Sequence, residues 1–300
     1  MLYTFFQLMV AIFLEAAPFL LLGSVVAAIV EEFTDEEFFR KLLPRRHGFV
    51  MLTGLFAGLI LPTCECGIVP VVRKLLSKGV PPAAAVTYMF AAPVINPVVI
   101  LSTYVAFQGD TKMVAGRLLI AAVTAVAMGW FLGGAVPASI LRNPDFAEEH
   151  GCSCCHHGSA SSQGVFSRVT AIASHATAEF FEMSRYLLLG AFVTALFKIS
   201  APMSLLDWFQ GNILVAIPMM MILAIVLSVC SEADAFVAAS FSSFPQVSLL
   251  AFIGIGPMVD LKLLVMYAAV FKKRIVADFI IVPILIVFGL CLILADWIGM

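Results

Sequence analysis

The chain has 300 residues, of which 62% are hydrophobic and only 12% are charged, and its formal net charge is -2. Soluble domains carry about 25% charged and about 45–50% apolar residues, so this composition argues against a soluble globular fold. With 17 basic against 19 acidic residues the chain also has no basic stripe to neutralise phosphates, and we expect no nucleic-acid partner.

Apolar segments long enough to cross a bilayer occupy most of the chain. A helix needs about 20 apolar residues to span the hydrocarbon core. The sequence therefore predicts an all-α integral membrane protein of about eight transmembrane helices, with both termini on one side: 3–30, 48–72, 81–107, 114–138, 178–200, 212–240, 246–270 and 275–298. The first span lacks the basic n-region of a signal peptide, so we expect it to be retained.

The chain divides into two halves that resemble each other, 1–140 and 175–300, separated by a Cys/His-rich linker loop, 141–174. LEAAPFLLLG corresponds to FEMSRYLLLG, which pairs Glu15 with Glu182 at an offset of 167. Two further matches follow with nearly the same offset, Cys64 with Cys230 and Asn96 with Asp260. Internal duplication is typical of secondary transporters. Four spans per half predict a parallel repeat, unless a broken segment is a re-entrant hairpin.

The Lys and Arg residues of the connections indicate the orientation of the chain. The connections after odd-numbered spans hold ten: Arg40, Lys41, Arg45, Arg46, Lys112, Arg117, Lys198, Lys272, Lys273 and Arg274. The other side holds five: Arg73, Lys74, Lys78, Arg142 and Arg168. This count predicts termini outside the cytoplasm, although the cluster from Arg73 to Lys78 argues for the opposite orientation.

The second span is interrupted by two prolines and a glycine in PTCECGIVP, residues 62–70, and we expect it to unwind there. Unwound backbone at membrane depth is tolerated only where it is buried in protein or lines a wet cavity. The break holds Cys64, Glu65 and Cys66. Thiolates select soft or borderline ions such as Cu(I) and Zn(II) and, by the same polarisability argument, trivalent arsenic, so these residues are candidate substrate ligands. The alternative is two small buried thiols and a glutamate paired with a nearby basic residue.

Similar breaks occur in APVINP, CSEADAF and GPMVDLK. Ionisable residues inside spans cost at least about 2.5 kcal/mol each on insertion scales and are candidates for functional sites. We expect Asn96, Cys230, Asp234 and Asp260 to join the same central substrate site. For the two aspartates the alternative is helix capping or an ion pair with Lys262.

Glu15 and Glu182 are candidate ion-coupling residues. Glu15 stands among apolar residues with no basic neighbour in the sequence, which favours a carboxyl that carries protons. Glu182 has Arg185 three residues further on, which can simply neutralise it. For both, a structural contact between helices is the alternative.

The linker contains CSCCHH, and its thiols and imidazoles chelate soft or borderline metals whether or not the segment is folded. The candidate ligands are Cys152, Cys154, Cys155, His156 and His157. We expect no cofactor other than a soft metal ion at this loop, and the alternative is an incidental linker. The charge count places this loop outside, where clustered thiols oxidise more readily.

Soluble enzyme motifs are missing from the sequence: there is no phosphate-binding GxxxxGK[ST], no dinucleotide fingerprint and no GxSxG elbow. We therefore do not expect an enzyme.

The segment LPTCECGIVPVVRKLLSKGVPPAAAVTYMFAAPVINPVVILSTY and the later CSEADAFVAASF resemble the bacterial predicted-permease family that includes the YraQ and ArsP permeases. This resemblance covers nearly all of the membrane part and implies a multi-pass permease of the bacterial inner membrane. Arsenical exporters of that family expel trivalent arsenic through cysteine-dependent binding, which the matching motifs assign here to Cys64, Cys66 and Asn96.

We expect a secondary permease that exports a thiophilic species, either an arsenical or a soft or borderline metal ion. Efflux of chromium, copper or zinc and a membrane thiol-redox or metal-sensing role are the alternatives. The sequence leaves the oligomeric state open, and a homo-oligomer is among the alternatives.

Overall fold

The computed structural model describes residues 2–33, 47–60, 63–142, 165–200, 213–241 and 243–298. These residues form helices, with one isolated β-bridge between Leu141 and Phe271. The helices are α1 (Leu2–Phe33), α3 (His47–Ile60), α4 (Glu65–Ser77), α5 (Pro82–Ala91), α6 (Pro97–Ala106), α7 (Thr111–Leu132), α8 (Pro137–Ile140), α9 (Val165–Ser200), α10 (Ile213–Leu227), α11 (Asp234–Ser240), α12 (Gln246–Ile255), α13 (Leu261–Val270) and α14 (Lys273–Ile298). The all-α prediction is confirmed.

Three of the described helices are long and apolar enough to cross a membrane by themselves: Tyr3–Ile29 of α1, α7 and α14. Large apolar side chains on these helices point outward, among them Leu14, Trp130 and Ile293. An outer surface of this kind suits contact with lipid chains, which require no polar partners.

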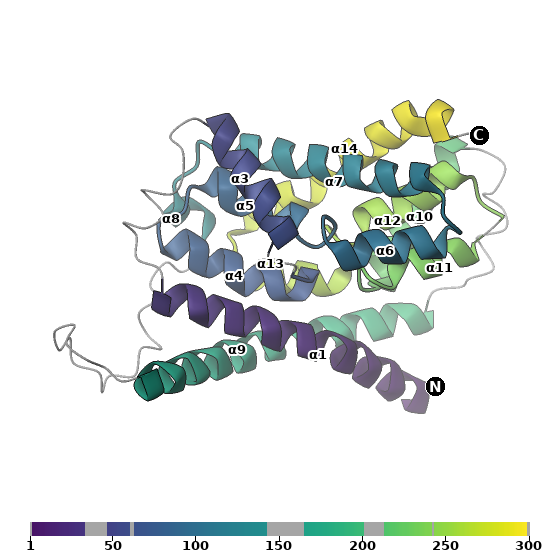
Figure 1. Cartoon of the computed structure of the whole chain (residues 1–300). Coiled ribbons are helices and arrows are strands. Elements are labelled where there is room, and N and C mark those ends of the chain that lie inside the picture. Colours follow the sequence, from purple (N-terminus) through teal and green to yellow (C-terminus); the bar gives the residue numbers. More distant parts are fainter. Residues whose placement is uncertain are drawn as a thin grey trace.

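Corresponding helices of the two halves run in opposite directions (Figure 1). α1 and α9 lie side by side and antiparallel, and Phe5 meets Phe192 edge-on with ring centroids 5.2 Å apart. α7 and α14 are also antiparallel, because Gly116 near the start of α7 lies beside Ile298 at the end of α14. The structure thus has an inverted arrangement in place of the expected parallel one, with both termini at the same end (Figure 1).

The expected spans 48–72 and 212–240 are each two helices that enter and leave at the same end. Gly54 and Gly58 of α3 lie against Ala84 and Ala92 of α5, so α3 and α5 run in the same direction. α4 starts at this inner end and finishes at Ser77, a few residues before α5 begins, so it must return to the end from which α3 came. α10, α11 and α12 repeat the pattern, because Ala224, Asp234 and Gly256 meet at the inner ends of these three helices.

The remaining elements cross the molecule. In the described residues these are α1, α5 with α6, α7, α9, α12 with α13, and α14. Each half therefore has three crossings and one re-entrant pair, and the odd number of crossings inverts the second half. The expected count of about eight spans is not confirmed, because the two proline- and glycine-containing breaks allow the chain to turn back, which is the re-entrant alternative that the sequence left open.

Two boundaries also differ from expectation. α9 begins at Val165, so the last ten residues of the expected loop 141–174 belong to a helix. Arg117, which the charge count treated as part of a short connection, lies inside α7 with 2% of its surface exposed. Its charge is satisfied within the protein, so it carries no information on orientation.

Basic residues gather at the end of the molecule where α4 and α13 finish. The main chain there is tied together, since the Arg142 N–H donates to the Val270 carbonyl and the Lys272 N–H to the Ile140 carbonyl. The connection between α1 and α3 starts and finishes at the same end (Figure 1). Among the described residues, the basic ones at this end are Arg73, Lys74, Lys78, Arg142, Lys272, Lys273 and Arg274. We refer to it as the basic end.

Candidate functional site

Helices that begin at the breaks bring three acidic residues to the centre of the molecule. Glu65 lies in the first turn of α4, Asp234 in the first turn of α11, and Asp260 is the N-cap of α13. The N-terminus of a helix has unpaired N–H groups and a partial positive charge, which stabilises a carboxylate there. The breaks therefore explain how these acidic residues are accommodated in an apolar chain.

Glu65 is the hub of the central contacts and is only 1% exposed. Its Oε1 lies 3.1 Å from the ammonium of Lys262, and its Oε2 accepts a hydrogen bond of 2.8 Å from the Ser231 hydroxyl. The sequence-based alternative paired Glu65 with a basic residue of its own segment, but both of these partners come from the second half. Glu65 thus joins the first half of the chain to the second.

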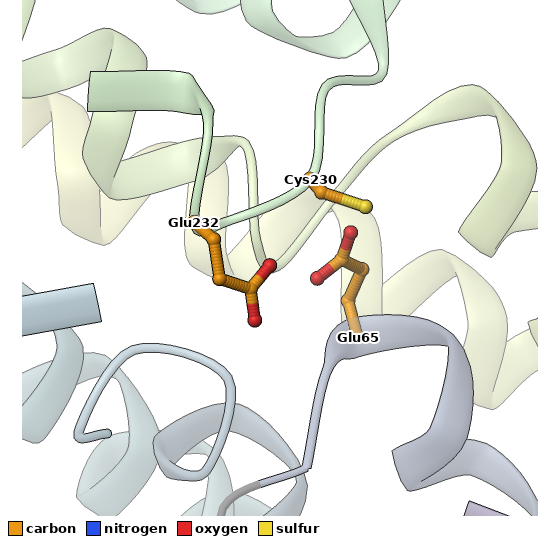
Figure 2. A group of neighbouring side chains, drawn as sticks. All are labelled: Glu65, Cys230 and Glu232. Atoms are coloured by element: carbon orange, nitrogen blue, oxygen red, sulfur yellow. The ribbon is translucent and has the colours of Figure 1, made fainter. Parts of the chain in front are cut away.

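Cys230 and Glu232 approach Glu65 from the connection between α10 and α11 (Figure 2). One ligand atom of each of these three residues lies within 4.8 Å of the others, a spacing that could hold a metal ion. Figure 2 shows the Cys230 sulfur and the Glu232 carboxylate directed toward the Glu65 carboxylate. Lys262 also donates to the Cys230 sulfur at 3.7 Å. Thiol and carboxylate groups together suit a borderline ion such as Zn(II).

The same connection contains a strained residue. Ser228 has a φ of 46°, in the left-handed region that a non-glycine residue rarely adopts. Its hydroxyl donates to the Ile225 carbonyl at 2.9 Å and accepts from the Leu261 N–H at 3.1 Å. These two bonds hold the break of α10 and α11 against the start of α13, and strain held in this way is often found at functional sites.

Cys64 and Cys66 are buried and free of disulfides at the start of α4. Cys64 is the N-cap, and its sulfur accepts from the Gly67 N–H at 3.3 Å. The Cys66 side chain has no exposed surface. The two thiols therefore lie one residue to either side of Glu65, in the first turn of a helix that reaches the centre.

Asn96 and Asp260 play matching structural roles. Asn96 caps α6 by accepting from the Val98 N–H at 3.0 Å, and Asp260 caps α13 by accepting from the Leu263 N–H at 2.6 Å. Asp260 also lies 3.6 Å from the Lys262 ammonium and so belongs to the central cluster. The described hydrogen bond of the Asn96 side chain is to its own helix, which favours the capping role for this residue.

Asp234 forms a second buried ion pair next to the cluster. The Arg117 guanidinium lies 2.7 Å from Asp234 and donates to the Thr103 hydroxyl at 2.7 Å and to the Ser231 carbonyl at 3.1 Å. Ser231 thus links this pair to Glu65. Sequence reasoning placed Arg117 in a connection and treated Lys262 only as a neutralising partner. The signal for both was a basic residue inside an apolar helix, which is costly unless it is paired.

The two coupling candidates lie in different surroundings. Glu182 pairs with Arg73 of α4 at 2.9 Å, whereas Arg185, the expected partner, donates to the Glu182 carbonyl. Glu15 lies exposed on α1, in contrast to the buried position that a proton carrier among apolar residues suggested. The proposed metal ligands Cys152, Cys154, Cys155, His156 and His157 lie outside the described residues.

A bundle of apolar helices with broken and re-entrant elements meeting in a polar, thiol-containing centre is the architecture of a membrane permease. The comparisons agree, because a family described as "Predicted permease" matches residues 1–295. The chain belongs to this predicted-permease family and is a multi-pass membrane protein in contact with the lipid bilayer.

Two curated bacterial proteins are similar over nearly their whole length. One, from Streptococcus mutans (strain UA159), is provisionally described as a subunit of a two-component membrane permease complex and is 37% identical over 284 residues, 94% of this chain and 92% of the relative. The other, UPF0718 protein YcgR of Bacillus subtilis (strain 168), is 39% identical over 271 residues, 90% of each chain. No solved structure matches.

Proposed function

We propose that this permease exports a thiophilic species, a trivalent arsenical or a soft or borderline metal ion, across the bacterial inner membrane by alternating access driven by an ion gradient. The observation that carries the proposal is the position of three buried free thiols, Cys64, Cys66 and Cys230, at the breaks of re-entrant elements. Thiols at such a position have no role in lipid contact, and their polarisable sulfur selects soft ions.

The mixed ligand set supports a metal cation as the rival substrate. Glu65, Cys230 and Glu232 provide oxygen and sulfur ligands that lie close together, a combination suited to Zn(II). A trivalent arsenical would instead depend on thiols alone. The two substrates therefore make different predictions for Glu232→Gln, which should impair export of a metal cation and leave export of an arsenical unchanged.

The description of the Streptococcus mutans relative as a complex subunit supports a partner for this chain as well. We propose that a second membrane subunit associates with it in the cell. Affinity purification of the tagged chain from its own host should recover this subunit in a fixed ratio, whereas recovery of the chain alone or as a homo-oligomer would contradict the proposal.

The function is tested by transport into proteoliposomes that contain the purified chain together with any subunit that co-purifies with it, with arsenite, methylated trivalent arsenicals, Zn(II) and Cu(I) as substrates. Cys64→Ser, Cys66→Ser and Cys230→Ser should each abolish transport of the active substrate, because a hydroxyl keeps the size but loses the soft ligand. Cys291→Ser is the matched control, since Cys291 is an equally buried free thiol in the C-terminal part of α14, away from the breaks.

Failure of every thiophilic substrate to move would contradict the proposal, as would full activity of all three variants. A change of thiol oxidation state without transport would favour the alternative of a thiol-redox or metal-sensing protein.

A further inference from the structure

The packing of α1 and α9 differs between the two ends of the molecule. α1 packs closely on α4, and α9 packs closely on α13. Both α4 and α13 run from the centre to the basic end. In the described residues neither has comparable packing against α6 or α11, which run from the centre to the end that holds the termini (Figure 1). The arrangement of helices is thus inverted between the halves, but their packing is not equivalent.

Close contacts reinforce the packing near the centre. A Cβ at Gly23 of α1 would lie 2.5 Å from the Gly67 Cα of α4, and one at Gly190 of α9 would lie 2.8 Å from the Lys262 Cα of α13. Gly23 and Gly190 are the residues that the offset of 167 pairs in sequence. The first contact is at Gly67, two residues from Glu65, and the second is at Lys262, the partner of Glu65. The positions of α1 and α9 therefore affect the central cluster directly.

A three-residue ion cluster holds α4 against α9 closer to the basic end. Arg73 of α4 makes two hydrogen bonds to Glu182 of α9, at 2.9 and 3.1 Å, and a third of 3.3 Å to Glu179. The three side chains are between 7% and 13% exposed. A guanidinium that grips a carboxylate with two hydrogen bonds is among the stronger and more directional polar contacts. We call Arg73, Glu179 and Glu182 the clamp.

The clamp lies between a cavity and the central site. A cavity of about 260 Å³ opens at the basic end, and its lining includes Arg73, Glu182, Tyr186 and Arg142. On the other side, Glu65 precedes Arg73 by eight residues on α4, about 12 Å at 1.5 Å per residue. The shortest route along α4 from this cavity to the central thiols therefore passes the clamp.

The other end has no matching clamp among the described residues. Glu15, which corresponds to Glu182, is exposed on α1, and no hydrogen bond or ion pair of its side chain is found in the described part of the chain. The geometry points to the clamp as the gate of the basic end, closed in this structure, whose opening separates α4 from α9. This inference rests on the alternating-access part of the proposed function and adds the gate residues to it.

The gate is tested by labelling the central thiols with a membrane-impermeant maleimide in right-side-out and inside-out vesicles. The rate is measured by mass spectrometry on the peptide that contains Cys230. Arg73→Ala should raise labelling from the basic end by about tenfold, the change that about 1.4 kcal/mol produces, and leave labelling from the other end unchanged. Arg73→Glu combined with Glu182→Arg should return the rate toward that of the unmodified protein, since Glu179 can then accept from the new arginine.

Arg185→Ala is the control, because Arg185 is exposed on α9, the helix that also carries Glu182. In the described contacts Arg185 bonds only a main-chain carbonyl and the face of the Tyr186 ring. An unchanged labelling rate in Arg73→Ala would overturn the gate. An equal rise from both ends would overturn it too, since that is the behaviour of a loosened fold. The measurement needs no transported substrate, so it separates failure of the gate from failure of the proposed substrate.

Discussion

The ammonium of Lys262 lies 3.1 Å from the carboxylate of Glu65, although the two residues are 197 positions apart in the chain. This ion pair joins the first turn of α4, a re-entrant helix of the first half, to the first turn of α13, part of a crossing element of the second half. It is the shortest described ionic contact made by Lys262 at the centre.

Replacement of Lys262 by Met should destabilise the protein and stop transport. Removal of one partner leaves a buried charge without compensation, which costs about 3–5 kcal/mol. The double variant Lys262→Met with Glu65→Gln should regain part of the stability, because of the two carboxylates beside Lys262 only Asp260 is then left without its cation, and it should stay inactive. Thermal unfolding in detergent measures the first effect and proteoliposome transport the second. A single variant as stable as the unmodified protein would contradict the role of this pair.

Arg117 and Asp234 form a further buried ion pair, and Arg117→Met should lower stability by a similar amount, about 3–5 kcal/mol. The reason is that Asp234 keeps its place in the first turn of α11 but loses its cation. Lys112→Met on the same helix is the control, because Lys112 is exposed and should change stability by less than about 0.5 kcal/mol. Equal unfolding temperatures for the two variants would argue against the importance of the Arg117 pair.

Gly23→Ala should reduce transport strongly. A Cβ at this position would lie 2.5 Å from both the Cα and the carbonyl oxygen of Gly67, and main-chain atoms cannot move aside as a flexible side chain can. α1 must then shift away from α4. Gly289→Ala is the matched control in α14, since a Cβ there meets nothing within 4 Å and alanine favours the helix by about 1 kcal/mol. Transport assays of the two variants at equal expression decide the question.

Both termini are predicted to lie outside the cytoplasm. Lys and Arg accumulate on the cytoplasmic side of membrane proteins. The basic end gathers these residues from both halves, and the termini lie at the opposite end (Figure 1). A reporter that is active only in the periplasm or on the outer surface should therefore be active at the C-terminus, and a reporter active only in the cytoplasm should be inactive there. The reverse pattern would contradict the orientation.

The same orientation affects the Cys/His linker. Arg142 and the start of α9, the described residues on either side of the linker, both lie at the basic end. With this end predicted to face the reducing cytoplasm, we expect linker thiols that stay available for metal, in contrast to the outside location that the charge count predicted. Deletion of residues 152–157 should shift the substrate concentration needed for half-maximal export and leave the maximal rate unchanged, as expected for capture before a separate translocation step. A complete loss of transport would instead mean that the linker contains residues essential for transport.

The sequence predicted the helical class and the positions of the breaks, because prolines and glycines are conspicuous in an apolar chain. Ionisable residues and thiols stand out in the same way, and the structure brings Cys230, Glu65 and Asp260 close to Lys262, but their role in transport stays a prediction. The direction of the chain after each break could not be predicted, since a proline interrupts a helix equally well whether the chain continues or turns back. That one ambiguity produced the count of eight spans and the parallel repeat.

The sequence also could not show which side chains form ion pairs between the two halves. Glu65 has basic residues nearby in the chain, but its actual partner Lys262 comes from the other half. Similarly, Glu182 has Arg185 one helical turn away and pairs with Arg73 instead. Side chains on one helix surface are close in sequence, whereas a buried contact between helices depends on a packing that only the fold reveals.

Because α1 and α9 run in opposite directions, the two ends of the protein are built from different parts of the two halves. Corresponding residues away from the centre, such as Glu15 and Glu182, lie toward opposite ends of the molecule. Each end therefore combines parts of the two halves that do not correspond to each other. Under the proposed alternating access, a substitution near Arg73 should alter the affinity on the face at the basic end without any matching change on the opposite face, while both faces share the same thiols. Selection would then be able to adjust uptake into the site and release from it separately, on a single pair of related backbones.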